Sequence, residues 1–109
     1  MNLLLHVSQV ERWIVAVGNT KNYLKEEKTS RVEIVLNSEA VSLFKQPTHD
    51  FLEDLIELYY LGVEILVCRN SLMSLNITES TLPKEVTVVP AGIFEIVAKQ
   101  ADGFAYVKP

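Results

Sequence analysis

Several residue types that mark a functional class are scarce in this sequence of 109 residues. Cys68 is the only cysteine, so no disulfide can form within the chain. The two histidines, His6 and His49, add too few soft ligands for a structural zinc site. The four glycines are scattered, and neither a phosphate-binding loop nor a G-x-G-x-x-G dinucleotide motif is present. The sequence therefore predicts no metal and no cofactor.

Positive charge and long apolar runs are also scarce. Ten Lys and Arg residues oppose fourteen Asp and Glu, giving a net charge of −4, which provides no general attraction for a nucleic acid. Apolar runs such as Leu3–Leu5 and Ile65–Cys68 are much shorter than the roughly 18 residues of a membrane-spanning helix. The N-terminus has no basic region of the kind that opens a secretory signal. We expect a cytoplasmic protein that binds neither nucleic acid nor a membrane.

The sequence does contain enough apolar residues for one compact core. Hydrophobic residues make up 49% of the chain, and its length fits a single domain over residues 1–109. Apolar, β-branched segments alternate with segments of helical periodicity, a pattern typical of a parallel sheet covered by helices. Five strands are predicted: Asn2–Val7, Arg31–Leu36, Val63–Val67, Val86–Val89 and Phe104–Val107.

Three longer helices are expected between these strands. The first follows a capping-box sequence at Ser8–Glu11, the second is capped by Asp50, and the last begins at Pro90 and ends at Gly103. A shorter helical segment is expected at Asn70–Leu75. The predicted buried faces carry Val10, Trp13, Ile14, Val17 and Leu24 in the first helix, Phe51, Leu52, Leu55, Ile56 and Tyr59 in the second, and Ile93, Ile96 and Val97 in the last.

Ligands of open α/β sheets bind beyond the carboxyl ends of the strands, and the most reactive residues there are Cys68-Arg69-Asn70-Ser71. The Cys68 thiol lies between a buried strand and the amino end of a helix, where free amides favour a thiolate. We expect Arg69 to add a positive charge, and Asn70 and Ser71 to shape the pocket by hydrogen bonds. The residues alone leave a second interpretation open, in which Cys68 is a small buried residue that completes the strand.

His6, at the end of the first strand, is a candidate base for Cys68 if the two strands are adjacent. Glu39, after the second strand, would then complete a Cys-His-Glu triad, and the protein would be a thiol hydrolase. This hypothesis requires the fold to bring Cys68, His6 and Glu39 together at one place.

Three segments of the sequence resemble the DsrE/DsrF-like family, in particular its small stand-alone members. They are the strand ending in Cys68 with Asn70-Ser71-Leu72 after it, the segment Val88-Val89-Pro90-Ala91-Gly92, and the closing Gly103-Phe104-Ala105-Tyr106. The resemblance implies a three-layer α/β/α fold with a mostly parallel, flavodoxin-like sheet. It also implies persulfide sulfur on Cys68, with Gly92 in the binding site.

The leading hypothesis is therefore a sulfur-trafficking, sulfurtransferase-like protein that needs no cofactor and exchanges sulfane sulfur with donor and acceptor proteins. The alternative is a small-molecule binding or regulatory module with a non-catalytic cysteine.

Aromatic residues near helix faces and loops predict a homo-oligomer, since such side chains are favoured at stable interfaces. The four concerned are Trp13, Phe44, Tyr59 and Tyr60, of which Phe44 is expected to be exposed. The family resemblance implies a trimer or a hexamer, and we expect the Cys68 pocket close to a subunit boundary.

Overall fold

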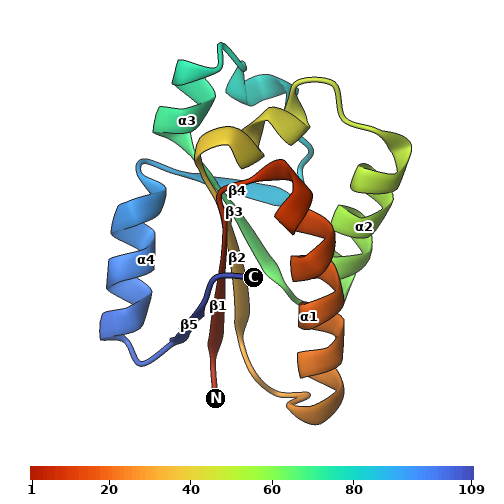
Figure 1. Cartoon of the computed structure of the whole chain (residues 1–109), viewed down its shortest axis with the longest axis vertical. Coiled ribbons are helices and arrows are strands. Elements are labelled where there is room, and N and C mark those ends of the chain that lie inside the picture. The colour runs from red at the N-terminus through yellow and green to blue at the C-terminus, as the bar shows by residue number, and fades with distance from the viewer.

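The computed structural model describes all of residues 1–109 and contains five strands and four α-helices (Figure 1). The strands are β1 (Leu3–Val7), β2 (Val32–Leu36), β3 (Glu64–Cys68), β4 (Val86–Val89) and β5 (Ala105–Val107). The α-helices are α1 (Trp13–Glu26), α2 (His49–Tyr60), α3 (Arg69–Ser74) and α4 (Gly92–Ala101), and 3₁₀ helices span Val10–Arg12, Ser38–Phe44 and Glu79–Thr81. No helix has both the length and the apolar character needed to cross a membrane.

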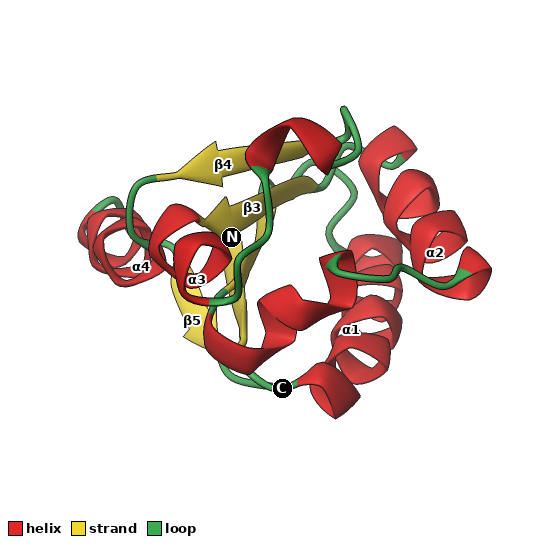
Figure 2. Ribbon diagram, turned by 90° about the horizontal axis from the view of Figure 1, so that it is seen from above, coloured by secondary structure: helices red, strands yellow, loops and turns green.

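All neighbouring strands are parallel, and their order across the sheet is β4-β3-β2-β1-β5. The predicted α/β class and the five strands are confirmed, although the order differs from the 2-1-3-4-5 order of flavodoxin. The chain steps in one direction from β1 to β4 and then returns past three strands to β5. Because crossovers between parallel strands share one handedness, this return places α4 on the face opposite α1 and α2. Figure 2 shows the sheet between these two layers.

The two faces of the sheet are covered to very different extents. A core cluster of twenty buried residues joins the sheet to α1, α2 and the segment Ser38–Phe44, and it also takes in Leu72 of α3. The cluster under α4 has five buried residues, namely Leu4, Val35, Leu66, Ile96 and Phe104. Strand β2 is buried along its whole length because it lies at the centre of the sheet and is covered on both faces.

The structure corrects one expectation about the aromatic residues and confirms another. Phe44 was expected on the surface but is only 5% exposed, and Trp13, predicted on the buried face of the first helix, is buried beside it. Both rings pack edge-on against Phe51, with centroids 5.1 Å and 5.2 Å away. The reason is local, because the polar residues Ser38 and Glu39 begin a 3₁₀ helix that turns the apolar side chains of its second half into the core.

The predicted helix starts are wrong in each long helix. A 3₁₀ turn precedes α1, and the Val10 amide donates to the Glu39 carboxylate at 3.2 Å, so Ser8 forms no cap. Helix α2 is capped by the Thr48 hydroxyl, which accepts from the Phe51 amide at 3.1 Å, instead of by Asp50. Helix α4 begins only after Ala91, because Pro90 belongs to the segment that carries the chain to the other face.

The predicted buried faces are also too wide. Ile14 in α1 and Ile93 and Val97 in α4 are mostly exposed, and in α4 only Gly92 and Ile96 are buried. Ile56 and Tyr59 of α2 are partly exposed as well. The helix ends agree better with prediction, since Gly62 and Gly103 adopt the positive φ angles of helix-terminating residues, 89° and 91°.

A charged side chain lies within the smaller core. Glu33 of β2 is fully buried, and as a carboxylate neither of its oxygens receives a hydrogen bond. Its nearest cations are Lys99, with Nζ 3.4 Å from Oε2, and Arg31, with Nη2 3.6 Å from the same atom. Burial, together with hydrogen bonding to Glu95 and the charge of that carboxylate, raises the pKa of Glu33 to about 7. In its protonated form Glu33 is therefore the donor to Glu95.

This arrangement predicts how stability depends on pH. A carboxyl whose pKa is higher in the folded state holds its proton more tightly there, so it lowers stability as the pH rises from about 4.5 to about 7. The variant Glu33→Gln keeps a donor towards Glu95 at every pH and carries no buried charge. We expect it to be more stable than the wild type at pH 8 by about 1–2 kcal/mol, with little difference at pH 5. Urea unfolding at both pH values measures this, and an equal loss of stability at both would contradict it.

Candidate functional site

The connections that leave β3 and β4 diverge at the carboxyl end of the sheet. Strand β3 leads into α3, whose Leu72 packs in the larger core, whereas β4 leads to α4 on the opposite face. Neighbouring strands whose connections diverge in this way leave a crevice between them, the usual position of a ligand site in open α/β sheets. Cys68 ends β3 and Gly92 begins α4, so both lie where these two connections diverge.

Gly92 packs directly against the candidate cysteine. A Cβ atom at this position would lie 3.4 Å from Cβ of Cys68, 3.3 Å from Cγ1 of Val35 and 3.3 Å from Cβ of Asn37. The missing side chain therefore lets the first turn of α4 approach the ends of β2 and β3. Any larger residue would separate the Gly92 amide from the sulfur.

Cys68 is buried, with 6% of its surface exposed, and it is surrounded by hydrogen-bond donors. Burial raises the pKa of the thiol, but hydrogen bonds from the Ser71 hydroxyl and from the amides of Gly92, Ser71 and Asn70 lower it by more. The pKa of Cys68 consequently lies below its ordinary value. A thiol with this environment is a better nucleophile near neutral pH and a better leaving group.

The Ser71 hydroxyl is itself held in place by the end of β2. Its Oγ accepts a hydrogen bond from the Ser38 amide at 2.8 Å, which leaves its own proton free to donate to the sulfur. Ser38 has a φ of 52°, in the left-handed region that residues with a side chain rarely adopt. This turn thus directs the Ser38 amide towards α3. A cavity of about 200 Å³ lies beside it, lined by Ser38, Asn70, Ser71, Ser74 and Leu75.

Arg69 does not supply the positive charge that was expected at the thiolate. Its Nε lies 2.5 Å from Oε1 of Glu79, and this exposed ion pair neutralises the guanidinium. The groups that lower the pKa of Cys68 are the neutral donors of Ser71, Gly92 and Asn70. The Asn70 side chain is exposed, and its backbone amide makes its contribution.

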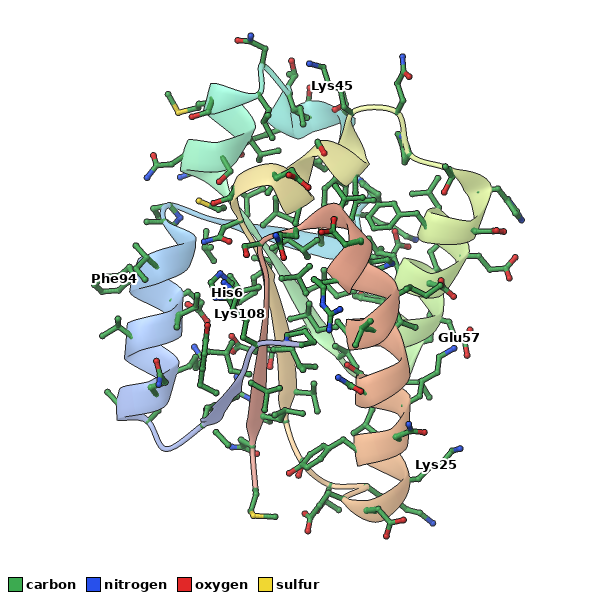
Figure 3. The ribbon with its side chains drawn as sticks, viewed as in Figure 1. His6, Lys25, Lys45, Glu57, Phe94 and Lys108 are labelled. Atoms are coloured by element: carbon green, nitrogen blue, oxygen red, sulfur yellow. The ribbon has the colours of Figure 1, made fainter.

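His6 and Cys68 do not form a pair, because β2 separates the strands that carry them. The His6 ring points from β1 to the side of the sheet that α4 covers (Figure 3). Its Nε2 lies 2.8 Å from Oδ1 of Asn37, and its Nδ1 lies 2.7 Å from the Tyr106 hydroxyl. Glu39 accepts from the amide of Val10. The Cys-His-Glu triad of a thiol hydrolase is therefore not assembled.

Two residues of this network were not among the predicted site residues, Asn37 and Tyr106. Both have sequence signals that point to their position. Asn37 directly follows the second strand, and Tyr106 lies two residues after Phe104 in the last predicted strand, so the side chains of Tyr106 and Phe104 are expected on the same face of the sheet. What the sequence could not show was that β1 lies between β2 and β5 and brings the two side chains to His6. The structure contains no group of three or more His, Cys, Asp and Glu side chains that could hold a metal ion.

Comparison with known proteins extends these observations. The profile of the DsrE/DsrF-like family matches residues 11–109. The structure is similar to that of MTH1491, a protein of unknown function from Methanobacterium thermoautotrophicum, with a TM-score of 0.91 and 26% identity over 99% of this chain and 98% of that one.

The fold is also similar to that of the ychN protein from E. coli, with a TM-score of 0.73 and 17% identity over 99% of this chain and 98% of that one. No curated protein matches the chain. The match over residues 11–109 covers most of the chain, including every strand after the first and the whole of the cysteine site. The chain therefore belongs to the DsrE/DsrF-like family.

Proposed function

We propose that the protein is a sulfur carrier of sulfurtransferase type, in which Cys68 accepts sulfane sulfur and passes it on. The observation that carries this proposal is the set of neutral donors around the Cys68 sulfur, which lowers the pKa of a buried thiol. Membership of the DsrE/DsrF-like family, which is generally associated with sulfur relay, supports it.

The reaction needs no oxidant and no cofactor. The Cys68 thiolate attacks the outer sulfur of a donor persulfide, a new S–S bond forms, and the old S–S bond breaks with its electron pair on the donor thiolate. An acceptor thiolate then attacks the outer sulfur on Cys68, and the Cys68 thiolate leaves. Because Cys68 is the nucleophile in the first step and the leaving group in the second, a lowered pKa assists both.

The alternative function is a small-molecule binding or regulatory module in which Cys68 is inert. The specific observation in its favour is that only 6% of the cysteine surface is exposed. The donors around the sulfur nevertheless lower the pKa of Cys68, which favours the thiolate that a sulfur carrier needs. We therefore rank the sulfur carrier first and place it in the cytoplasm, where the reducing conditions keep a lone cysteine free of disulfides.

Sulfur uptake is tested by incubating the protein with glutathione persulfide and measuring its intact mass. We expect the wild type to gain the mass of one sulfur atom, and the variant Cys68→Ser to gain none, because Cys68 is the only thiol in the chain. Treatment with a small thiol should remove the added sulfur. A wild type that stays unmodified under these conditions would eliminate the carrier function and favour the binding module.

The contribution of Ser71 is tested through the pH dependence of alkylation. The variant Ser71→Ala removes one donor to the thiolate, which raises the pKa of Cys68. We expect iodoacetamide to react about tenfold more slowly at pH 7, with an unchanged rate at a pH where the thiol is fully ionised. Ser74→Ala is the matched control, since Ser74 lies on the same helix but is not among the donors to Cys68. If the pH profiles of alkylation for Ser71→Ala and the wild type are identical, the Ser71 hydroxyl does not stabilise the Cys68 thiolate.

We propose further that the protein forms a homo-oligomer with threefold symmetry, a trimer or a hexamer. Tyr59 and Tyr60 are exposed on α2, and a further apolar surface lies on α4, where Ile93, Phe94 and Val97 are 63%, 74% and 59% exposed. Figure 3 shows Phe94 projecting away from the sheet. Because α4 begins at Gly92, an interface along this helix would bring a second subunit close to Cys68.

The assembly is measured by sedimentation equilibrium at micromolar concentration. We expect a mass of at least three times the 12.3 kDa of one chain. Phe94→Lys places a charge in the proposed interface and should reduce the mass to that of a monomer, whereas Ile14→Lys on α1, a position that is 70% exposed, is the control for a surface away from α4. A monomeric wild type would contradict the assembly.

A further inference from the structure

Four side chains form a polar row across the face of the sheet that α4 covers. From one edge inward they are Tyr106 on β5, His6 on β1, Asn37 at the end of β2, and Cys68 at the end of β3. Tyr106 is paired with Leu4, two residues before His6 on the same face. Leu36 is paired with Val67, so the same register places Asn37 beside Cys68. The row links one edge strand of the sheet with the candidate sulfur site.

The hydrogen bonds along this row have a fixed direction. Oδ1 of Asn37 can only accept, so the proton between it and His6 belongs to Nε2, and the ring donates. When the ring is neutral its Nδ1 then carries no proton and accepts from the Tyr106 hydroxyl. The contact between Nε2 and Oδ1 thus fixes both the tautomer of His6 and the end of the Asn37 amide that faces β1, whereas the Tyr106 hydroxyl, which can donate or accept, fits either tautomer.

The Nδ2 group of Asn37, at the other end of its side-chain amide, is a free donor at the cysteine site. No hydrogen bond within the chain uses the Asn37 Nδ2 group, and this group is not buried. Since Oδ1 is held on the side of β1, the NH2 group is directed away from β1. Cβ of Asn37 and Cβ of Cys68 both lie against Gly92, 3.3 Å and 3.4 Å from where its Cβ would stand. A group attached to the Cys68 sulfur would therefore form within reach of Nδ2.

We propose that Asn37 is a catalytic residue that donates a hydrogen bond to the outer sulfur of a persulfide on Cys68, and that His6 is the residue that positions it. This inference rests on the sulfur-carrier function proposed above. The donors of Ser71, Gly92 and Asn70 hold the inner sulfur and stabilise the empty thiolate. In a persulfide anion the charge lies on the outer sulfur, beyond these donors, and a donor from the end of β2 stabilises it there.

The two sets of donors have separable effects. Loss of a donor to the inner sulfur changes the pKa of the free thiol, as described for Ser71→Ala. Loss of the donor to the outer sulfur changes the equilibrium between persulfide and thiol, and leaves the pKa of the free thiol where it was. A residue with only a structural role would alter both quantities or neither. The experiment therefore measures both on each variant.

The persulfide equilibrium is measured by intact mass in buffers with fixed ratios of glutathione persulfide to glutathione. For Asn37→Ala we expect the equilibrium constant for sulfur uptake to fall about tenfold, the effect of one hydrogen bond to a charged group, with an unchanged pH profile of alkylation. Asn22→Ala, an exposed asparagine on α1, is the matched control. Thermal unfolding of each variant checks whether the fold is retained.

The positioning role of His6 is measured by combining variants. His6→Ala should lower the same equilibrium constant, and the double variant should be no worse than Asn37→Ala alone, because His6 acts through Asn37. Additive losses, or an equilibrium constant for Asn37→Ala equal to that of the wild type, would overturn the inference while the carrier function stands. A wild type that takes up no sulfur at all would overturn both.

Discussion

The return of the chain from β4 to β5 is the constraint on which the rest of the structure depends. Strands β1 to β4 are added in one direction, and had β5 simply continued this series, every helix would lie on one face and the other face would be bare. The return across three strands brings α4 to that second face. It also makes the connections of β3 and β4 diverge, and Cys68 ends its strand at the point of divergence.

Burial and hydrogen bonding have opposite effects on the pKa of Cys68, and both result from the close packing of α4 against the sheet. The thiol is buried because α4 begins with a glycine and packs closely against the ends of β2 and β3, and burial alone would raise its pKa. The same close approach brings the Gly92 amide to the sulfur, and the end of β2 orients Ser71 through the Ser38 amide. The hydrogen-bond donors lower the pKa of Cys68 by more than burial raises it. A site that relies on neutral donors, with Arg69 held by Glu79, stabilises the anion without attracting other anions to it.

The sequence was sufficient to predict the class of fold, the strands and the place of Cys68 between a strand and a helix, because these depend on local patterns. Buried parallel strands are nearly continuous apolar runs, and Val86–Val89 was predicted with its observed bounds. The helix faces were predicted less well. Periodicity shows which residues share a face, but how much of that face is covered depends on the packing partner, and α4 has only the small cluster around Ile96 beneath it. The partners of His6 required the strand order, which no local pattern contains.

Cys68 and the buried Glu33 both lie beneath helix α4, on the face of the sheet that has the smaller core. Helix α4 runs from Gly92, which touches Cys68, to Lys99, which lies beside the buried Glu33, and its own core has five residues against twenty on the other face. A layer with so little buried apolar surface gains less free energy from packing than the layer of α1 and α2, because this free energy scales with the area removed from water. Local opening at α4 would expose the Cys68 sulfur while the larger core remains intact. In an oligomer that packed along Ile93, Phe94 and Val97, as proposed above, the neighbouring subunit would add apolar contacts to this helix and oppose such opening.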